Sequence, residues 1–227
     1  MVCNINTLNK NCVLVIWILG FCLQACLASV NVSVYYETLC PDCINFITTQ
    51  LHPTYLELGD QFVHLDFIPY GNTKEDVING TTTFICQHGP KECFGNEIHG
   101  CVVYFERINV TERFINCAES AYVPTSLNTF KDCANKYGVS WARVEHCNTS
   151  GLAEKILGEN GARTKLIQPK WVPTIVFNDV FNESDNNEAQ RNFKAVVCRY
   201  LGNKPEQCSS LNSIKNFFRS QVTVERI

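Results

Sequence analysis

The sequence lacks the features of a nucleic-acid-binding protein or of a protein with several membrane spans. It has no cluster of basic residues, and its 19 Lys and Arg are outnumbered by 22 Asp and Glu. Because proteins bind nucleic acids largely through clustered cations, nucleic acid is not an expected partner. No second long apolar run follows the N-terminal one, so we expect no membrane span in the mature chain. The chain ends in VTVERI rather than in a Lys-Asp-Glu-Leu type signal, which argues against residence in the endoplasmic reticulum.

The one long apolar run, residues 12–28, has the features of a secretory signal peptide. It is short for a membrane span, Lys10 is the basic residue before it, and the small Ala28 at its end suits cleavage. We therefore expect residues 1–28 to be removed, the alternative being an uncleaved membrane anchor. The remaining chain is long enough for one domain with a buried core.

Cysteine is abundant in the rest of the chain. Ten of the 14 cysteines follow residue 28, and an even, dense set after a signal peptide predicts a disulfide framework formed in an oxidising compartment. Five Asn-x-Ser/Thr sequons predict glycans on surface loops, at Asn31, Asn79, Asn109, Asn148 and Asn182. Both features indicate passage through the secretory pathway.

The first part of the chain alternates between strand and helix patterns. Residues 30–39 alternate apolar and polar side chains and are rich in Val and Tyr, which predicts a strand. A helix is predicted from Asp42 to about Gly59, with a kink or break at Pro53. Residues 61–71 predict a second strand, which should lie parallel to the first because a helix joins them.

The middle and last parts of the chain complete a recognisable order of elements. Residues 83–166 hold six cysteines and several helical patterns, with Thr111 as a candidate cap and Gly138 as a helix end. Residues 172–177 predict a strand followed by a turn and a short partner strand, and residues 186–202 predict a helix.

This order is that of an α/β protein with a thioredoxin-like fold and a disulfide-stapled helical insertion. The domain would cover residues 29–202, with the insertion at about 83–166 and a C-terminal tail at 203–227. The insertion would separate the first β-α-β unit from the last β-β-α unit.

The stretch Cys40-Pro41-Asp42-Cys43 joins the first strand to the helix. Cys40 should be the N-cap and Pro41 the first helical residue, where a missing N–H costs nothing. Because free N–H groups and the positive dipole end stabilise a thiolate there, we expect Cys40 to be an exposed nucleophile. Cys43, buried one turn further on, should stay protonated until it resolves the mixed disulfide. Asp42 should oppose the thiolate, since a neighbouring carboxylate raises the pKa of a thiol.

Other interpretations of these residues stay open. A structural bridge or half of a metal site is the alternative for Cys40 and Cys43. In thioredoxin-like folds a cis-proline before a late strand packs against the Cys-x-x-Cys loop, and the backbone of the preceding residue faces the substrate. Pro173 and Val172 hold those places here, although X-Pro bonds are mostly trans and Pro173 could simply begin a strand.

A second motif, residues 86–101, reads CQHGPKECFGNEIHGC. Three cysteines with His88 and His99 could suggest zinc, but the spacing matches no common zinc motif and we assign no metal. The residues favour a disulfide-tied turn at the start of a helix. For both histidines we expect a structural hydrogen bond, and for Asn96 a hydrogen bond near the helix.

This second motif resembles the signature of the gamma-interferon-inducible lysosomal thiol reductases. The signature is Cys-Gln-His-Gly, two residues, Glu-Cys, two residues, Asn, four residues, Cys. It is met in full by Cys86, Gln87, His88, Gly89, Glu92, Cys93, Asn96 and Cys101. Cys40, Cys43 and Pro173 also fall where the family has its redox pair and proline, so the resemblance covers roughly residues 30–202.

The resemblance implies a glycosylated thiol reductase that cleaves the disulfides of protein substrates at acidic pH, in lysosomes or endosomes or after secretion. It implies Cys40 and Cys43 as the catalytic pair, no bound cofactor and an external thiol reductant. The signature cysteines would hold the insertion against the core. Some family members lose a C-terminal propeptide, and a bridged Cys208 would keep the tail attached. A secretory-pathway disulfide oxidase or isomerase, and a non-enzymatic disulfide-rich binding protein, are the alternatives, and the oligomeric state stays open.

Overall fold

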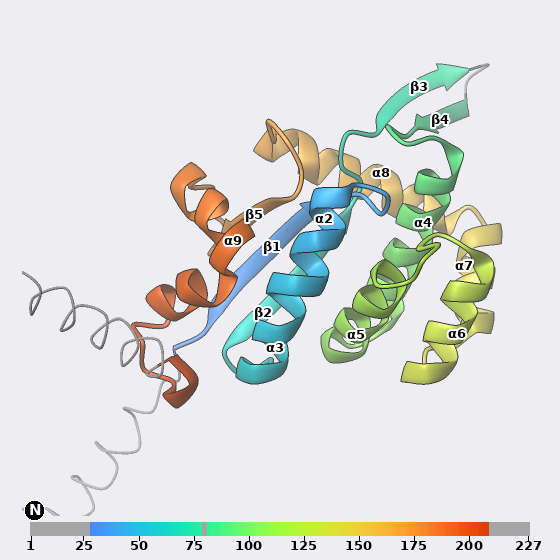
Figure 1. Ribbon diagram of the computed structural model, residues 1–227. Helices are drawn as coiled ribbons and strands as arrows, with labels where there is room; N and C mark the ends of the chain where they lie inside the picture. The colour runs from blue at the N-terminus through green and yellow to red at the C-terminus, as the bar shows by residue number, and fades with distance from the viewer. Residues whose placement is uncertain (1–27, 79–80, 209–227) are drawn as a thin grey trace, which may run out of the picture.

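The computed structural model describes residues 28–78 and 81–208, which form a three-stranded sheet, a separate hairpin and the helices around them (Figure 1). The strands are β1 (Val30–Tyr36), β2 (Val63–Pro69), β3 (Lys74–Ile78), β4 (Thr81–Ile85) and β5 (Thr174–Phe177). The helical segments are α2 (Pro41–Asn45), η1 (Phe46–Leu51), α3 (His52–Leu58), α4 (Pro90–Phe105), α5 (Ile108–Glu119), α6 (Leu127–Tyr137), α7 (Trp141–Thr149), α8 (Leu152–Ile167) and α9 (Glu183–Tyr200). Residues 1–27, which hold nearly all of the predicted signal peptide, and Asn79 lie outside the described residues.

Strand β1 is the centre of the sheet, whose order is β2-β1-β5. It pairs in parallel with β2, where Tyr36 lies beside Pro69, and antiparallel with β5, where Tyr35 lies beside Thr174. The parallel pair confirms the prediction from the intervening helix. A strand covered on both faces needs apolar side chains at most positions, and in β1 only Asn31 is exposed.

The connection from β1 to β2 is helical throughout residues 41–58. It passes from α2 into the π-helical segment η1 and then into α3, which carries Pro53 in its first turn. Of the predicted kink or break at Pro53, the break does not occur. The helix instead changes its hydrogen-bonding pattern in the turn before the proline, which adapts the chain to a residue without an N–H.

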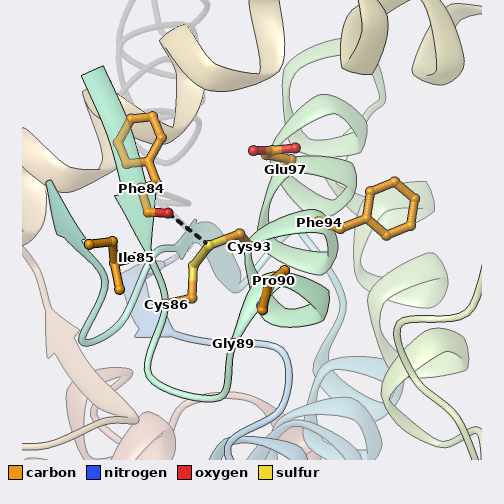
Figure 2. A pocket seen from close by; sticks show the side chains of 8 residues that line it. All are labelled: Phe84, Ile85, Cys86, Gly89, Pro90, Cys93, Phe94 and Glu97. Carbon is orange, nitrogen blue, oxygen red and sulfur yellow. Dashed lines mark hydrogen bonds between the residues drawn. A yellow bond between two sulfur atoms is a disulfide. The ribbon is translucent and has the colours of Figure 1, made fainter. Parts of the chain in front are cut away.

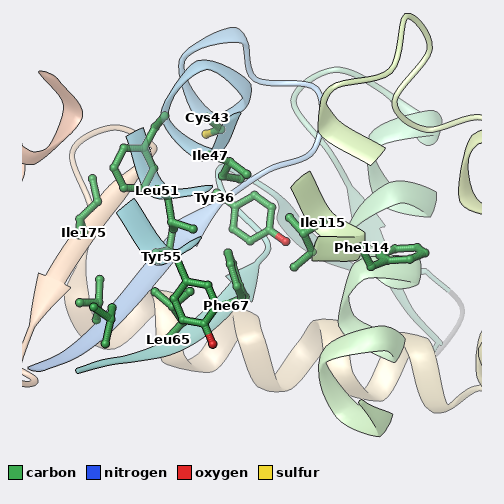
Figure 3. Close-up of a cluster of buried hydrophobic side chains, with 14 of the residues drawn as sticks. Tyr36, Cys43, Ile47, Leu51, Tyr55, Leu65, Phe67, Phe114, Ile115 and Ile175 are labelled. Carbon is green, nitrogen blue, oxygen red and sulfur yellow. The ribbon is translucent and has the colours of Figure 1, made fainter. Parts of the chain in front are cut away.

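Apolar side chains from this connection fill the space above one face of the sheet (Figure 3). Ile47 and Leu51 are fully buried there with Phe67 of β2, and Phe114 of α5 extends the same cluster toward the middle helices. Helix α8 lies behind the sheet in Figure 1, where its Ile167 packs against a second, smaller buried cluster. The sheet is thus covered on both faces, as the fold class predicts.

The start of the middle region differs from the prediction. Residues 83–85 belong to the hairpin of β3 and β4, so the helices of this region begin only at Pro90. Val77 and Ile85 of the hairpin are 67% and 52% exposed. Because these two apolar side chains face solvent, the hairpin lacks the alternation of buried and exposed residues that identifies a strand.

Two local predictions also fail. Thr111 does not cap a helix, because α5 begins earlier, with Arg107 as its N-cap. The partner strand expected after β5 is a single bridge between Phe177 and Val180. Gly138, in contrast, ends α6 in the left-handed conformation that glycine favours, as predicted.

Four disulfides cross-link the described residues, namely Cys86–Cys93, Cys101–Cys147, Cys117–Cys133 and Cys198–Cys208. The first three join elements of the middle region to one another, so the expectation that signature cysteines tie this region to the core is wrong. The fourth ties Cys208 to α9, and a cut between the two cysteines would leave the tail attached. Across residues 28–78 and 81–208, no helix has the length and apolar character that crossing a membrane requires.

Candidate redox site

Cys40 and Cys43 are the free cysteines among the described residues, and both lie at the start of α2. Cys40 is the N-cap, as predicted, and its Sγ accepts a hydrogen bond from the Cys43 backbone N–H at 3.3 Å. Pro41 is the first helical residue and needs no hydrogen-bond acceptor there. A sulfur that accepts N–H groups at a helix N-terminus is stabilised as the thiolate.

The two thiols have opposite acidities. The hydrogen bond from the Cys43 thiol lowers the pKa of Cys40, burial opposes this, and the backbone N–H groups of Cys43 and Asp42 lower it further. Burial raises the pKa of Cys43 well above its usual range, and the hydrogen bond to Cys40 adds to the rise. Of the two thiols, Cys40 is thus the one that ionises more readily, as a nucleophile requires.

The carboxylate that opposes the Cys40 thiolate is Glu37 rather than Asp42. The charge of Glu37 raises the pKa of Cys40, whereas Asp42 lowers it through its backbone N–H. Glu37 lies in the turn between β1 and α2, where its side chain is buried, while Asp42 is exposed to solvent. Solvent screens the exposed charge, so the buried one has the larger effect on the thiol.

Val172 and Pro173 lie against the redox pair, and the peptide bond between them is cis. The Cys40 thiol lies 3.8 Å from the carbonyl oxygen of Val172. Cys40 is only 7% exposed, which differs from the exposed nucleophile expected from the sequence. The contact with the Val172 carbonyl places the 172–173 segment beside the Cys40 sulfur.

The signature motif supports the loop that ends in Cys40. The Oδ1 atom of Asn96 accepts a hydrogen bond from the backbone N–H of Thr38 at 3.0 Å, and the Thr38 hydroxyl donates to the carbonyl oxygen of Glu92. At Gly95, a Cβ atom would lie 2.4 Å from the Thr38 hydroxyl, so glycine allows the close approach of α4 to this loop. Spacing alone could not show that the motif packs under the redox loop.

We expect Asn96→Ala to destabilise the protein by about 1 to 3 kcal/mol, because it leaves the buried N–H of Thr38 without an acceptor. Asn96 is fully buried. Urea unfolding of both proteins measures the difference. Asn135→Ala, at an exposed position of α6, is the matched control and should change stability by less than about 0.5 kcal/mol. Equal losses in the two variants would contradict the assigned role.

His88 of the motif lies at the redox site rather than in a remote structural position. Its Nδ1 hydrogen-bonds the Glu92 carboxylate and lies 3.5 Å from Oε1 of Glu37. Burial disfavours the imidazolium, but the Glu92 hydrogen bond and the charges of Glu92, Glu37 and Cys40 raise the pKa of His88 overall. Glu37 was not among the predicted site residues, because no spacing in the sequence links it to His88.

The donor atoms of Glu37, His88 and Glu92 lie within 4.8 Å of one another. The imidazole already hydrogen-bonds Glu92, and Asn72 donates its backbone N–H to the other oxygen of Glu37. A hydrogen bond joins His88 to Glu92 and an ion-pair contact joins His88 to Glu37, and we assign no metal to the set.

His99 has a different environment and a different role. It is fully buried, the Tyr36 hydroxyl lies 3.0 Å from its Nδ1, and burial lowers its pKa to about 3. Glu119, also buried, lies 3.7 Å from the same nitrogen, and burial raises the pKa of its carboxyl. His99 therefore stays neutral and acts as a packing and hydrogen-bonding residue, as expected from the sequence.

A cavity of about 320 Å³ opens beside the Cys86–Cys93 disulfide. Figure 2 shows Phe84, Pro90 and Phe94 around it, with the Glu97 carboxylate at its rim. Burial and the charge of Glu154 raise the pKa of Glu97 to about 7. The cavity therefore becomes electrically neutral in mild acid.

Three of the four described sequons lie in helices or strands rather than in the predicted loops, and Asn182 alone of the four lies in a loop. Asn31 is in β1, Asn109 in α5, Asn148 in α7, and Asn182 is the N-cap of α9. Asn31, Asn109 and Asn182 are nevertheless exposed, while Asn148 is half-buried.

Comparison with known proteins agrees with this geometry. Residues 31–137 match the family described as gamma interferon inducible lysosomal thiol reductase. The chain is 35% identical over 202 residues to GILT-like protein 1 of Drosophila melanogaster, covering 82% of this chain and 80% of that protein. It is 34% identical over 199 residues to a gamma-interferon-inducible lysosomal thiol reductase of Carassius auratus, covering 84% of this chain and 76% of that protein.

Solved structures confirm the fold. The oxidised DsbA of Mycobacterium tuberculosis superposes with a TM-score of 0.52 at 19% identity, covering 81% of this chain and 89% of that one. A DsbA of Pseudomonas aeruginosa gives a TM-score of 0.51 at 14% identity, covering 79% of this chain and 89% of that one. At these identities the likeness concerns the fold alone, which is thioredoxin-like.

Proposed function

Since the chain belongs to the gamma-interferon-inducible lysosomal thiol reductase family and is a thiol–disulfide oxidoreductase, we propose that it reduces protein disulfides through Cys40 and Cys43 at acidic pH. The observation that carries the proposal is the pair of free cysteines at the start of α2, with a lowered pKa at Cys40 and a raised one at Cys43. Val172 and Pro173 would bind the substrate backbone beside them.

The reaction proceeds in two exchanges. The Cys40 thiolate attacks one sulfur of the substrate disulfide, and the other sulfur leaves as a thiolate that takes a proton. Cys43 then loses its proton and attacks Cys40, which releases the second substrate thiol and leaves a Cys40–Cys43 disulfide. Two electrons pass to the substrate, and an external thiol restores the dithiol. No bound cofactor is needed.

Acidic conditions make activation of Cys40 essential. At about pH 5, a thiol with a pKa of about 8.5 is ionised in roughly one molecule in three thousand. The N–H groups at the start of α2 lower the pKa of Cys40 and so raise this fraction. We propose that the protein works in lysosomes or endosomes, or after secretion, and carries glycans at its exposed sequons. The lysosomal name of the Carassius auratus relative supports this location.

The test is reduction of a quenched disulfide-linked peptide by the purified protein at about pH 5 and about pH 7. We expect activity that is retained or higher in acid and absent in Cys40→Ser. Activity confined to neutral pH would instead favour a disulfide oxidoreductase of the secretory pathway. No activity at either pH would leave a disulfide-rich binding protein.

A further inference from the structure

The cavity beside the Cys86–Cys93 disulfide has apolar walls on several sides (Figure 2). Strand β4 contributes Phe84 and Ile85, and the first turn of α4 contributes Pro90. Ile85 is 52% exposed, so this wall is open to solvent. The volume of about 320 Å³ is at the lower end of the range for binding pockets. A cavity of this size and lining suits a single apolar side chain.

The walls of this cavity are held in place by contacts within the protein. The disulfide joins the turn after β4 to α4, and the Cys93 sulfur lies 3.6 Å from the carbonyl oxygen of Phe84, as the dashed line in Figure 2 shows. Phe84 also packs against α8, since a Cβ atom on Gly158 would lie 3.7 Å from its ring. Binding in a preformed cavity requires less ordering than binding in one that must first be created.

The turn formed by residues 86–89 separates the cavity from the redox loop. Both ends of this turn line the cavity. Within the turn, His88 contacts the Glu37 carboxylate at 3.5 Å, and the backbone carbonyl of Glu37 accepts the N–H of Cys40. An extended chain advances about 3.3 Å per residue, so a few residues of a polypeptide held at Cys40 can cross this turn.

The carboxyl group of Glu97 lies at the rim of the cavity (Figure 2). Among the described residues, Glu154 of α8 is the charged residue that acts on it, and β4 faces the cavity with the uncharged Phe84 and Ile85. Burial and the charge of Glu154 raise the pKa of Glu97 to about 7. The carboxyl is therefore neutral at about pH 5 and about nine-tenths ionised at about pH 8. An ionised carboxylate opposes the burial of an apolar side chain beside it, because the charge would lose solvent.

We propose that this cavity binds an apolar side chain of the substrate polypeptide, a few residues from the cysteine that Cys40 attacks, and binds it more strongly in acid. The proposal rests on the function proposed above for Cys40 and adds the class of substrate, namely disulfides that lie in apolar segments. Such segments are mostly buried in folded proteins, so unfolded proteins present them. The cavity would thus favour unfolded substrates under acidic conditions.

Two other cavities among the described residues have charged linings. One lies between residues 70–73 and the end of α8 and includes Lys165, and the other lies between α3 and α5 and includes Asp60 and Arg113. These charges would lose solvent if an apolar group bound beside them. Of the three cavities, the one beside the disulfide therefore suits an apolar side chain best.

Paired peptides test the substrate class. Each pair of quenched disulfide-linked peptides differs in one position, Leu or Ser, placed about two to six residues to either side of the attacked cysteine. At about pH 5, we expect kcat/KM to be about tenfold higher with Leu at one such position, which corresponds to about 1.4 kcal/mol. Complete burial of a leucine side chain provides more than this, so partial burial is sufficient.

The pH dependence of this preference tests the role of Glu97. At about pH 8 the ratio between the Leu and Ser peptides should fall to about two, whereas Glu97→Gln should keep a ratio of about ten at both pH values. Both peptides react with the same Cys40, so the ionisation of the thiol cancels in the ratio. Glu159→Gln is the matched control on α8, with a side chain that is 63% exposed, and should behave like the unchanged protein.

A change in the cavity wall locates the binding site. Ile85→Ser removes an apolar side chain from the wall and should lower the ratio at about pH 5 from about ten to about three or less. Val77→Ser is the control, because Val77 lies on β3 of the same hairpin, is 67% exposed and does not line the cavity. It should leave the ratio unchanged. Both positions are exposed, so both variants should fold, which circular dichroism checks.

Equal rates for the Leu and Ser peptides at every position at about pH 5 would overturn the proposal. So would a preference for Leu that Ile85→Ser leaves unchanged, because the side chain would then bind elsewhere. A preference that falls at about pH 8 in Glu97→Gln as it does in the unchanged protein would overturn the acid dependence assigned to Glu97. Failure of the proposed function looks different, since the unchanged protein would then reduce neither peptide of any pair through Cys40.

Discussion

Cys43→Ser should stop the protein in a covalent complex with its substrate. Cys40 can still attack, because the variant keeps the helix N-terminus and the backbone N–H of residue 43 that binds its sulfur. Without the second thiol, the mixed disulfide persists until an external thiol cleaves it. We expect multiple-turnover reduction to fall by about 100-fold or more, while the first exchange still occurs. The serine hydroxyl can donate to the Cys40 sulfur in place of the Cys43 thiol, whose hydrogen bond lowers the pKa of Cys40, so the first exchange should keep its activation.

A non-reducing gel with a disulfide-bonded protein substrate measures the trapped complex, and peptide mapping locates the bond. The complex should disappear on addition of a reductant. Cys40→Ser is the control and should trap nothing, because Cys43 is buried and its pKa is raised. Trapping in Cys40→Ser but not in Cys43→Ser would reverse the two assigned roles.

Local sequence signals were sufficient to place the redox pair. A strand followed by Cys-Pro-Asp-Cys and a helical pattern defines the N-cap, because capping depends on residues within one turn of each other. The same holds for Gly138 at the end of α6. The parallel pair of β1 and β2 followed from chain connectivity alone.

The charged residues around the redox pair could not be predicted in this way. Glu37, Asn72 and His88 are far apart in the sequence. Asn72 meets Glu37 because β2 pairs with β1, and His88 meets it because α4 packs under the turn after β1. A structural role was predicted for His88, because the motif itself does not show which side chains its imidazole contacts. The cysteine pairings were equally open, since Cys101 and Cys147 come together only when α4 and α7 pack.

Buried carboxyl groups give the protein an unusual response to acid. Burial is the first cause of a raised pKa at Glu37, Glu97, Glu112 and Glu119. When the pKa of a carboxyl is higher in the folded state than in the unfolded state, folding takes up a proton at every pH between these two pKa values. Each of these groups therefore favours the folded state more as the pH falls toward about 4.5. His99 has the opposite effect on stability. Its pKa is lowered to about 3 in the folded state, so in mild acid it gains a proton only when the protein unfolds.

The four carboxyls and His88, whose pKa is raised, together outnumber His99 and Cys40, whose pKa values are lowered, so we expect the free energy of unfolding to be larger at pH 5 than at pH 7. Glu97 allows the cleanest measurement, since its pKa of about 7 lies inside this window. Glu97→Gln should stabilise the protein by about 1 to 2 kcal/mol at pH 7 and by much less at pH 5, because the buried charge is removed. The variant's unfolding free energy should accordingly change less between these two pH values.

Urea unfolding at several pH values between about 5 and 7 measures both effects, and Glu159→Gln is the control. Glu159 lies on α8 with a side chain that is 63% exposed, so its replacement should leave the pH dependence unchanged. If Glu97→Gln changed the free energy of unfolding by the same amount at every pH, the Glu97 carboxyl would not titrate in this range. If the prediction holds, the protein is most stable under the acidic conditions in which Cys40 is proposed to work.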